Sequence, residues 1–165
     1  MLQVNYPLLS QKMPVAIKRV WRKTWLCKMV VALFIGGLSL GSYQFFWHHQ
    51  WLFYGTLIYL GLTVIILLID FLLIPYRYTF HRYELAKEDL AFQQGFIFRS
   101  TTYVPLQRIQ HIETEQGPFL RQENLMGLVI HTAATKHRIL GLEVQTAQQL
   151  RQQIIEMIRQ VADDV

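Results

Sequence analysis

The chain has 165 residues, a formal net charge of +5 and a single cysteine, Cys27. One cysteine excludes an internal disulfide bond and a thiolate metal site. The charge is unevenly distributed, because the first 28 residues hold six bases and no acid, whereas residues 77–165 hold ten of each. A nucleic-acid-binding domain would carry its basic patch on the folded part of the chain, so we expect no nucleic-acid partner.

Residues 1–24 form a basic segment that we expect to lie at the cytoplasmic surface of a membrane. Bases in such a segment are attracted to anionic lipid headgroups by on the order of 1 kcal/mol each. The simpler alternative is that they only fix the orientation of the chain in the membrane. The candidate bases for headgroup contact are Lys18, Arg19, Arg22, Lys23 and Lys28.

The next segment contains no lysine or arginine over 48 residues, from Met29 to Tyr76. We expect a transmembrane hairpin over residues 25–75, because about 20 apolar residues suffice to cross a bilayer. Its two helices are predicted at about 25–47 and 51–74. Pro75 is expected to end the second helix, since proline cannot donate the helical hydrogen bond.

The bases flank the outer ends of this hairpin and are absent from its connector, His48-His49-Gln50. The positive-inside rule then predicts a multi-pass protein of the cell (inner or plasma) membrane with both termini in the cytoplasm. The first apolar run is too long for the core of a signal peptide, so we expect it to be retained.

Three residues inside the hairpin have alternative interpretations. Gly37 and Gly41 have the small-xxx-small spacing that lets helices approach closely, either within the hairpin or with a partner helix. Asp70 is an acid near the predicted cytoplasmic end, where it can anchor the helix or pair with a base. A carboxylate in hydrocarbon can also mark an ion pathway, so an ion-conducting oligomer is a further alternative.

Residues 76–165 are predicted to be one small cytoplasmic domain, with antiparallel strands followed by a helix. Alternating or β-branched runs bounded by turn residues indicate the strands. Gly117-Pro118 is expected to be a turn between two of them. The predicted strands are Tyr76–Tyr83, Leu90–Gln93, Phe96–Val104, Arg108–Glu115, Leu125–Thr132 and His137–Leu140.

The end of the chain predicts an amphipathic helix of about four turns. Thr146 and Gln149 have the spacing of a capping box, with Thr146 as the N-cap. Apolar residues recur behind it on one helical face: Leu150, Ile154, Met157, Ile158 and Val161. The expected fold class is therefore a membrane helical hairpin plus an α+β domain, in which a six- or seven-stranded antiparallel sheet curves into a sandwich or open barrel closed by the helix.

The segments Thr101–Arg121 and Gly127–Ala134 resemble the membrane-flanked bacterial pleckstrin-homology-like (PH-like) domain family of the YdbS type. The core Val104-Pro-Leu-x-Arg-Ile-Gln110 is the most specific part of this resemblance, which covers nearly all of the chain after Trp25. The resemblance implies a PH-like split barrel or sandwich capped by the carboxyl-terminal helix. It implies mainly structural roles for Leu106, Arg108, Gln110 and Gly117-Pro118.

The resemblance also implies a function without catalysis. Members of this family resemble scaffolds for oligomers or membrane complexes, sometimes alongside a longer relative that has several copies of the domain. Some members are associated with tolerance of membrane-active peptides. The turn Ala86–Asp89 is net acidic, so phosphoinositide binding of the eukaryotic PH type does not carry over. We therefore expect a homo-oligomer or a complex with a longer relative, and no catalytic residue, cofactor or metal.

The alternative is an enzyme site on one strand face. His111, Glu113 and Glu115 alternate, so they share one face of a strand and could bind a divalent cation. A further ligand would have to come from His131 or His137. An ordinary solvated strand face explains the same pattern, and the chain lacks the nucleotide-binding, nucleophile-elbow, zinc-helix and CxxC motifs.

Overall fold

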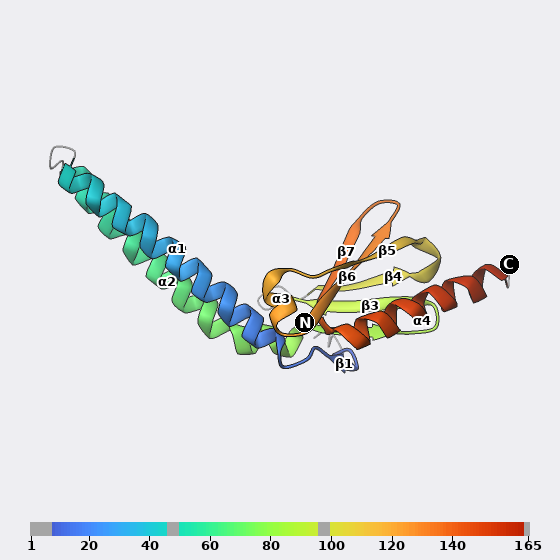
Figure 1. The fold of residues 1–165 in the computed structure, drawn as a ribbon. Helices are drawn as coiled ribbons and strands as arrows, with labels where there is room; N and C mark the ends of the chain where they lie inside the picture. Colours follow the sequence, from blue (N-terminus) through green and yellow to red (C-terminus); the bar gives the residue numbers. More distant parts are fainter. Residues whose placement is uncertain (1–7, 46–49, 96–99, 164–165) are drawn as a thin grey trace, which may run out of the picture. The chain divides into compact units, whose positions relative to one another are not determined.

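The computed structural model describes residues 8–45, 50–95 and 100–163 (Figure 1). These residues belong to two compact units. One unit is the helical hairpin, Trp21–Ile74, and the other joins Met1–Val20 to Pro75–Val165. The described residues 8–20 thus group with the sheets.

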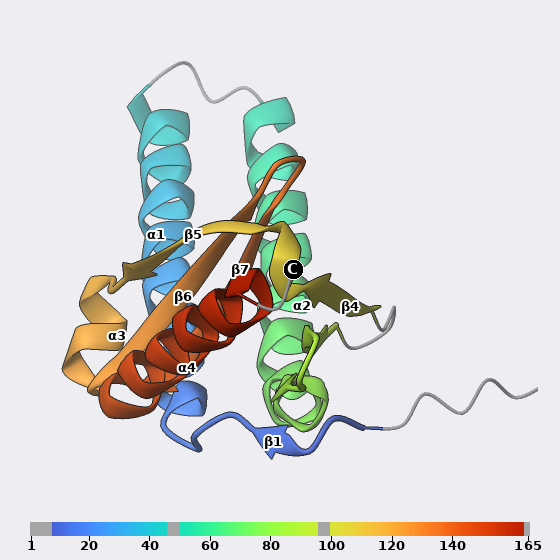
Figure 2. The same ribbon diagram turned by 90° about the vertical axis from the view of Figure 1, so that its right-hand side faces the viewer.

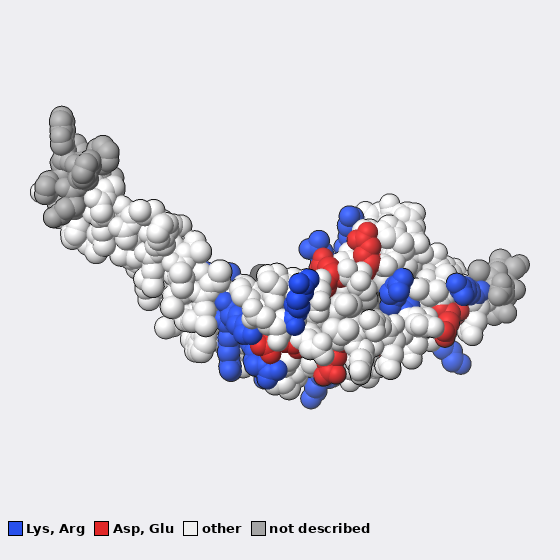
Figure 3. Space-filling view, viewed as in Figure 1, with Lys and Arg blue, Asp and Glu red and all other residues white. Residues whose placement is uncertain are grey.

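Two long helices form the hairpin, α1 (Ile17–Phe45) and α2 (Gln50–Phe80). Both are long and apolar enough to cross a membrane, and only 6% of the residues in either apolar window are buried. Figure 3 shows the same property as a surface almost free of charged side chains along the hairpin. The predicted end of the first span at Trp47 and the connector residues 48–49 lie outside the described residues.

Hydrogen bonds link the two helices, and a glycine lets them approach closely. The hydroxyls of Ser39 and Thr56 are hydrogen-bonded at 2.6 Å. At the other end, the Trp25 indole N–H donates to the carbonyl oxygen of Leu67 at 2.7 Å. Between them, a side chain at Gly36 would put its Cβ 2.8 Å from Leu60 Cδ2, so this glycine allows the closest approach of the helices.

The predicted helix end at Pro75 is wrong, because α2 continues through Pro75 to Phe80. Proline inside a helix costs about 3 kcal/mol, so the residues that follow it must gain stability elsewhere. They do so in packing: Phe80 is buried, its ring lies 4.8 Å from that of Tyr76, and the Tyr78 hydroxyl donates to the Met13 carbonyl at 2.9 Å. The aromatic residues expected to alternate along a strand are therefore helical.

In the described residues, seven strands form two antiparallel sheets, in the orders β1-β2-β3-β4 and β5-β6-β7. The sheets pack as a PH-like sandwich and do not close into a barrel, which confirms the sandwich form of the predicted fold class. The strands are β1 (Gln11–Lys12), β2 (Arg82–Leu85), β3 (Asp89–Gln94), β4 (Ser100–Pro105), β5 (Ile109–Glu115), β6 (Leu125–Thr132) and β7 (Lys136–Glu143).

The first sheet contains a strand that the sequence analysis missed. The two-residue β1 pairs with β2, and the Arg82 guanidinium donates to the Leu9 carbonyl at 3.0 Å. In the β2–β3 hairpin the Ala86 amide donates to the Asp89 carbonyl at 2.9 Å. Residues 96–99, the start of the predicted third strand, lie outside the described residues, and the structure places β4 at Ser100–Pro105.

In the second sheet, β5 follows a 3₁₀ turn, η1 (Leu106–Arg108). The turn predicted at Gly117-Pro118 is instead the start of a short helix, α3 (Pro118–Gln122). Proline is favourable at a first helical position, because the amide that it lacks would have no helical partner there. Gly117 therefore serves as the N-cap of α3.

The closing helix, α4 (Val144–Asp163), begins before the predicted N-cap Thr146. Strand β7 runs directly into it, and the Val144 amide donates to the Asn124 carbonyl at 3.3 Å, so a backbone group takes the place of a capping side chain. The predicted stripe is in place as far as described, since Leu150 and Ile154 are buried. Helix α4 packs on β6, β7 and η1. Figure 2 shows α4 lying beside β6.

The core of the sandwich consists of large aliphatic side chains from both sheets and α4. Ile17, at the start of α1, joins this core and packs against Gly141, where φ is +92° and a Cβ would lie 2.3 Å from Ile17 Cδ1. The fully buried members are Ile17, Leu90, Leu106, Leu125, Leu128, Ile130, Ile139, Leu142 and Ile154.

Candidate functional site

The candidate functional site lies on the outer face of the second sheet, where β5 pairs with β6. Antiparallel pairing places His111 directly opposite His131, and Glu113 follows two residues later on the same face of β5. A register shift between Ile109 and His111 precedes this pair. Two imidazoles and one carboxylate thus converge from two neighbouring strands.

The three side chains are close enough to act together. Glu113 Oε1 lies 3.4 Å from His111 Nε2, and Glu113 Oε2 lies 3.0 Å from His131 Nε2. The two imidazole rings are stacked, with centroids 3.9 Å apart and planes inclined by 19°. One ligand atom from each residue lies within 4.8 Å of the other two, which makes the trio a candidate metal centre.

The environments of the three groups differ. His131 is buried, with 6% of its surface exposed, whereas His111 and Glu113 are exposed. His131 Nε2 has no hydrogen-bond partner, because its 3.0 Å approach to Glu113 is not aligned for one. The side chains of His131 and then His111 hold the pKa of Glu113 below its usual range. Glu113 therefore stays an anion next to two imidazoles.

Two residues named in the sequence analysis do not join this cluster. Glu115 turns instead to Arg138, whose Nε lies 3.8 Å from Glu115 Oε1. His137 Nε2 is hydrogen-bonded to Thr135 Oγ1 at 2.8 Å, and its ring lies 5.3 Å from that of Phe92. The trio proposed from the alternation on one strand is thus replaced by His111, Glu113 and His131.

The sequence signal for His131 was present but ambiguous. His131 and His137 were equivalent candidates for a further ligand, because choosing between them needs the register of β5 on β6. That register depends on the register shift between Ile109 and His111. No single residue in the sequence indicates where this shift occurs.

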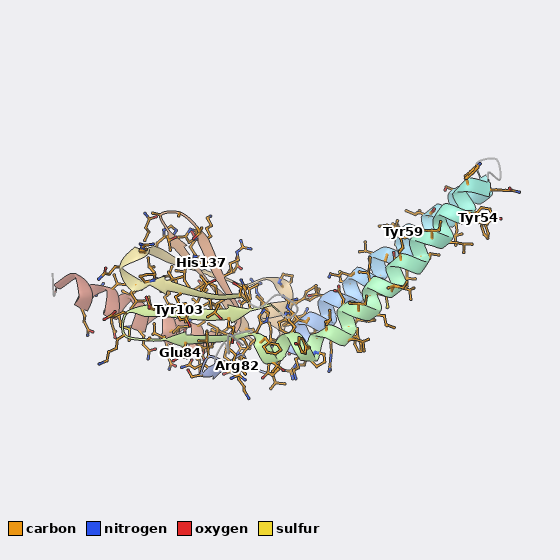
Figure 4. The ribbon with its side chains drawn as sticks, turned by 180° about the vertical axis from the view of Figure 1, so that it is seen from behind. Tyr54, Tyr59, Arg82, Glu84, Tyr103 and His137 are labelled. Atoms are coloured by element: carbon orange, nitrogen blue, oxygen red, sulfur yellow. The ribbon has the colours of Figure 1, made fainter. Side chains whose placement is uncertain are left out.

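The residues of the family motif divide between the core and a groove. Leu106 is fully buried, whereas Arg108 and Gln110 are exposed and line a groove of about 480 Å³ beside Tyr103 and His137. Figure 4 shows the side chains of Tyr103 on β4 and His137 on β7. The structural role that the resemblance implies thus fits Leu106 better than the two polar residues.

Several of the bases assigned to lipid contact also contact groups of the protein. Arg19 Nε contacts Glu123 Oε2, and Lys18 Nζ lies 4.0 Å from the centroid of the Tyr78 ring. In the hairpin, Lys28 Nζ lies 2.9 Å from Asp70 Oδ2. Arg22 is exposed on α1, and Lys23 is partly buried.

Side chains built on the glycines of the small-residue spacing would meet no other described part of the hairpin. A Cβ at Gly37 or at Gly41 would meet nothing within 4 Å among the described residues. The close approach of α1 to α2 depends instead on the neighbouring Gly36. One face of α1 therefore offers a small-residue surface in the apolar part of the helix.

Comparisons with known proteins agree on one family. A family model for the bacterial PH domain matches residues 26–158. The chain is 33% identical over 150 residues to the UPF0699 transmembrane protein YdbS of Bacillus subtilis (strain 168), covering 89% of this chain and 91% of that protein. No solved structure matches the chain significantly. The family match and the relative confirm the resemblance seen in the sequence.

Proposed function

Since this chain belongs to the bacterial PH domain family and carries two transmembrane helices, we propose that it is a scaffold that assembles a membrane complex. The hairpin anchors the protein, and the PH-like sandwich serves as a binding and oligomerisation module. Its family is one of membrane PH-domain proteins and is not a known enzyme family, which favours binding over catalysis.

The observation that carries this proposal is the uncovered glycine face of α1. Gly37 and Gly41 lie one turn apart, and neither would contact another part of the described chain through a Cβ. In a bilayer, helices associate through close packing of small residues rather than through hydrophobic burial. A glycine pair that the hairpin itself does not use is therefore available to a helix of another molecule.

The partner that fits this face best is a second copy of the chain, because each copy brings the same small-residue surface to a two-fold interface. A longer relative with its own hairpin and PH-like domains would fit by the same chemistry. Either assembly would present several PH-like domains at one membrane site. We propose that this complex serves envelope defence, including tolerance of membrane-active peptides.

Leucine substitution tests the glycine face directly. In native membranes, we expect Gly37→Leu together with Gly41→Leu to lower chemical cross-linking between copies at least severalfold, because the added side chains separate the helices. The hairpin itself should stay intact, since leucine is a better helix former than glycine by about 1 kcal/mol. The matched control is Gly61→Leu on α2, another apolar-window glycine with nothing within 4 Å of its Cβ.

Equal cross-linking in the glycine-face variant and the control would contradict self-association through α1. The defence role has its own readout in a strain that lacks the protein. The wild-type chain should restore tolerance of a membrane-active peptide, and the glycine-face variant should not. Restoration by both would separate the defence role from this interface.

We also propose an orientation and a lipid preference. The protein lies in the cell membrane as a multi-pass protein with both termini in the cytoplasm, as the basic flanks of the hairpin favour. Lys18, Arg19, Arg22, Lys23 and Lys28 are the bases proposed to face anionic headgroups. No nucleic-acid partner is proposed, because residues 77–165 hold equal numbers of bases and acids.

A further inference from the structure

We infer that His111, Glu113 and His131 form a binding site for a divalent transition metal ion, with Zn²⁺ as the ion that the donor set fits best. The site lies on the outer face of β5 and β6 and does not depend on the glycine face of α1. Two imidazole nitrogens and one carboxylate oxygen are a ligand set that zinc commonly takes in proteins. Copper(I), a softer ion, prefers sulfur ligands. Magnesium, a harder ion, prefers a set of oxygen ligands.

The present distances are already close to those of a metal site. Zinc binds imidazole nitrogen at 2.0–2.1 Å and carboxylate oxygen at 2.0–2.2 Å, so two ligand atoms around a tetrahedral ion lie about 3.3 Å apart. Glu113 Oε1 lies 3.4 Å from His111 Nε2, and Glu113 Oε2 lies 3.0 Å from His131 Nε2. Small side-chain rotations of the exposed His111 and Glu113 would complete the geometry.

The buried histidine is the second, independent observation. His131 has 6% of its surface exposed, and its Nε2 has no hydrogen-bond partner although it points at Glu113. Buried polar atoms without an aligned hydrogen-bond partner are rare unless a water or an ion binds them. A metal ion between His131 and Glu113 would supply that partner.

The charge and the backbone both suit a cation. The Glu113 carboxylate lies between the two imidazoles, with Oε1 nearest His111 Nε2 and Oε2 nearest His131 Nε2, so it offers an oxygen ligand beside both nitrogen ligands. Paired strands fix the two histidines at one position of the register, opposite each other on β5 and β6. A site built on strands is more rigid than one built on loops, which lowers the cost of binding.

Three protein ligands would leave at least one position of a tetrahedral ion open. In zinc enzymes this position holds water or substrate, whereas in assemblies it can take a ligand from another molecule. The inference is that this site binds the ion, and no reaction is assigned to it. The three ligands and their position on β5 and β6 are sufficient to support binding.

The test measures metal binding by the full-length chain in detergent. Competing groups are removed first, by Cys27→Ser and by His48→Asn with His49→Asn, because a histidine pair can also hold zinc. After treatment with a chelator, the protein is titrated with Zn²⁺ against a chromophoric competitor, and bound metal is counted by mass spectrometry. We expect one equivalent per chain.

Variants then assign the ligands. Glu113→Gln and His111→Gln should each weaken Zn²⁺ binding by at least about tenfold, since each removes one of three ligands. The matched control is Glu115→Gln, two residues farther along the same strand and outside the cluster, and it should bind like the parent chain. Co²⁺ in place of Zn²⁺ should give the visible absorption of a tetrahedral site, lost in the Glu113→Gln variant.

The inference is overturned if the parent chain binds less than about a tenth of an equivalent. It is equally overturned if Glu113→Gln and His111→Gln bind as tightly as the parent, or if Glu115→Gln weakens binding as much as they do. Because both replaced ligands are exposed, these variants should keep the fold, and circular dichroism of each variant verifies this.

Discussion

At the scale of the residue, the ion pair between Lys28 and Asp70 explains the only acid in the hairpin. Asp70 Oδ2 lies 2.9 Å from Lys28 Nζ, on the facing helix, and the side chains are 42% and 58% exposed. An unpaired carboxylate close to hydrocarbon is costly, whereas an unpaired lysine can extend its ammonium group to water. The geometry therefore favours an interhelical anchor over an ion pathway.

This asymmetry makes a prediction for a double-mutant cycle. We expect Lys28→Met to lower the free energy of unfolding by up to about 1 kcal/mol, more than Asp70→Asn, because it leaves the carboxylate without its partner. The double variant should regain part of the stability that Lys28→Met loses. The coupling energy should be on the order of 1 kcal/mol or less, since both groups are partly exposed. Reversible unfolding in mixed micelles measures all four free energies.

Strictly additive losses would show that the two charges do not stabilise each other. Flux of ions through liposomes that contain the Asp70→Asn variant provides the second readout. A loss of conductance there would restore the ion-pathway alternative, which the pairing with Lys28 disfavours.

At the scale of the element, the first turns of α1 carry the proposed headgroup contact. Arg22 is exposed on α1 and Lys23 comes next in the sequence, so lipid contact is tested at these two bases. We expect Arg22→Gln with Lys23→Gln to lower the ratio of retained anionic to zwitterionic lipid severalfold, because each base contributes about 1 kcal/mol. Lipids bound to the purified protein are counted by mass spectrometry.

The matched control changes two exposed bases of α4, Arg151→Gln with Arg159→Gln, and thus removes the same charge. An equal fall in both double variants would mean that only net charge matters. High salt should also reduce the difference, since exposed charges are screened within about 8–10 Å at physiological ionic strength.

Elements with a strong pattern could be predicted from the sequence, and those set by tertiary contacts could not. The apolar helices and the stripe of α4 follow directly from hydropathy and helical period. The passage of α2 through Pro75 depends on the packing of Tyr78 and Phe80, and β1 is too short to have a period. For the candidate site, the alternation along one strand predicts that His111 and Glu113 share a face. The contribution of His131 could not be predicted, because it depends on the register of β6 against β5.

At the scale of the whole molecule, the proposed headgroup contacts depend on the orientation of the protein in the membrane. They need the basic ends of the hairpin on the cytoplasmic side, where anionic headgroups are proposed to bind them. Six bases precede residue 29, Arg77 lies in the last turn of α2 and Arg82 comes just after this helix, whereas residues 29–76 contain no base. Moving such bases across a bilayer is unfavourable, so these flanks favour the proposed orientation with both termini in the cytoplasm.

Cysteine labelling tests this orientation, because Cys27 is the only cysteine and Cys27→Ser leaves a background without thiols. We expect Gln50→Cys, at the exposed start of α2, to react with a membrane-impermeant maleimide in spheroplasts. Arg151→Cys, exposed on α4, should react only after the membrane is permeabilised. The reverse pattern would place the sandwich outside the cell, where neither the cytoplasmic headgroups nor a cytoplasmic partner could reach it. Since both thiols are exposed, a difference in labelling reports the side of the membrane rather than burial.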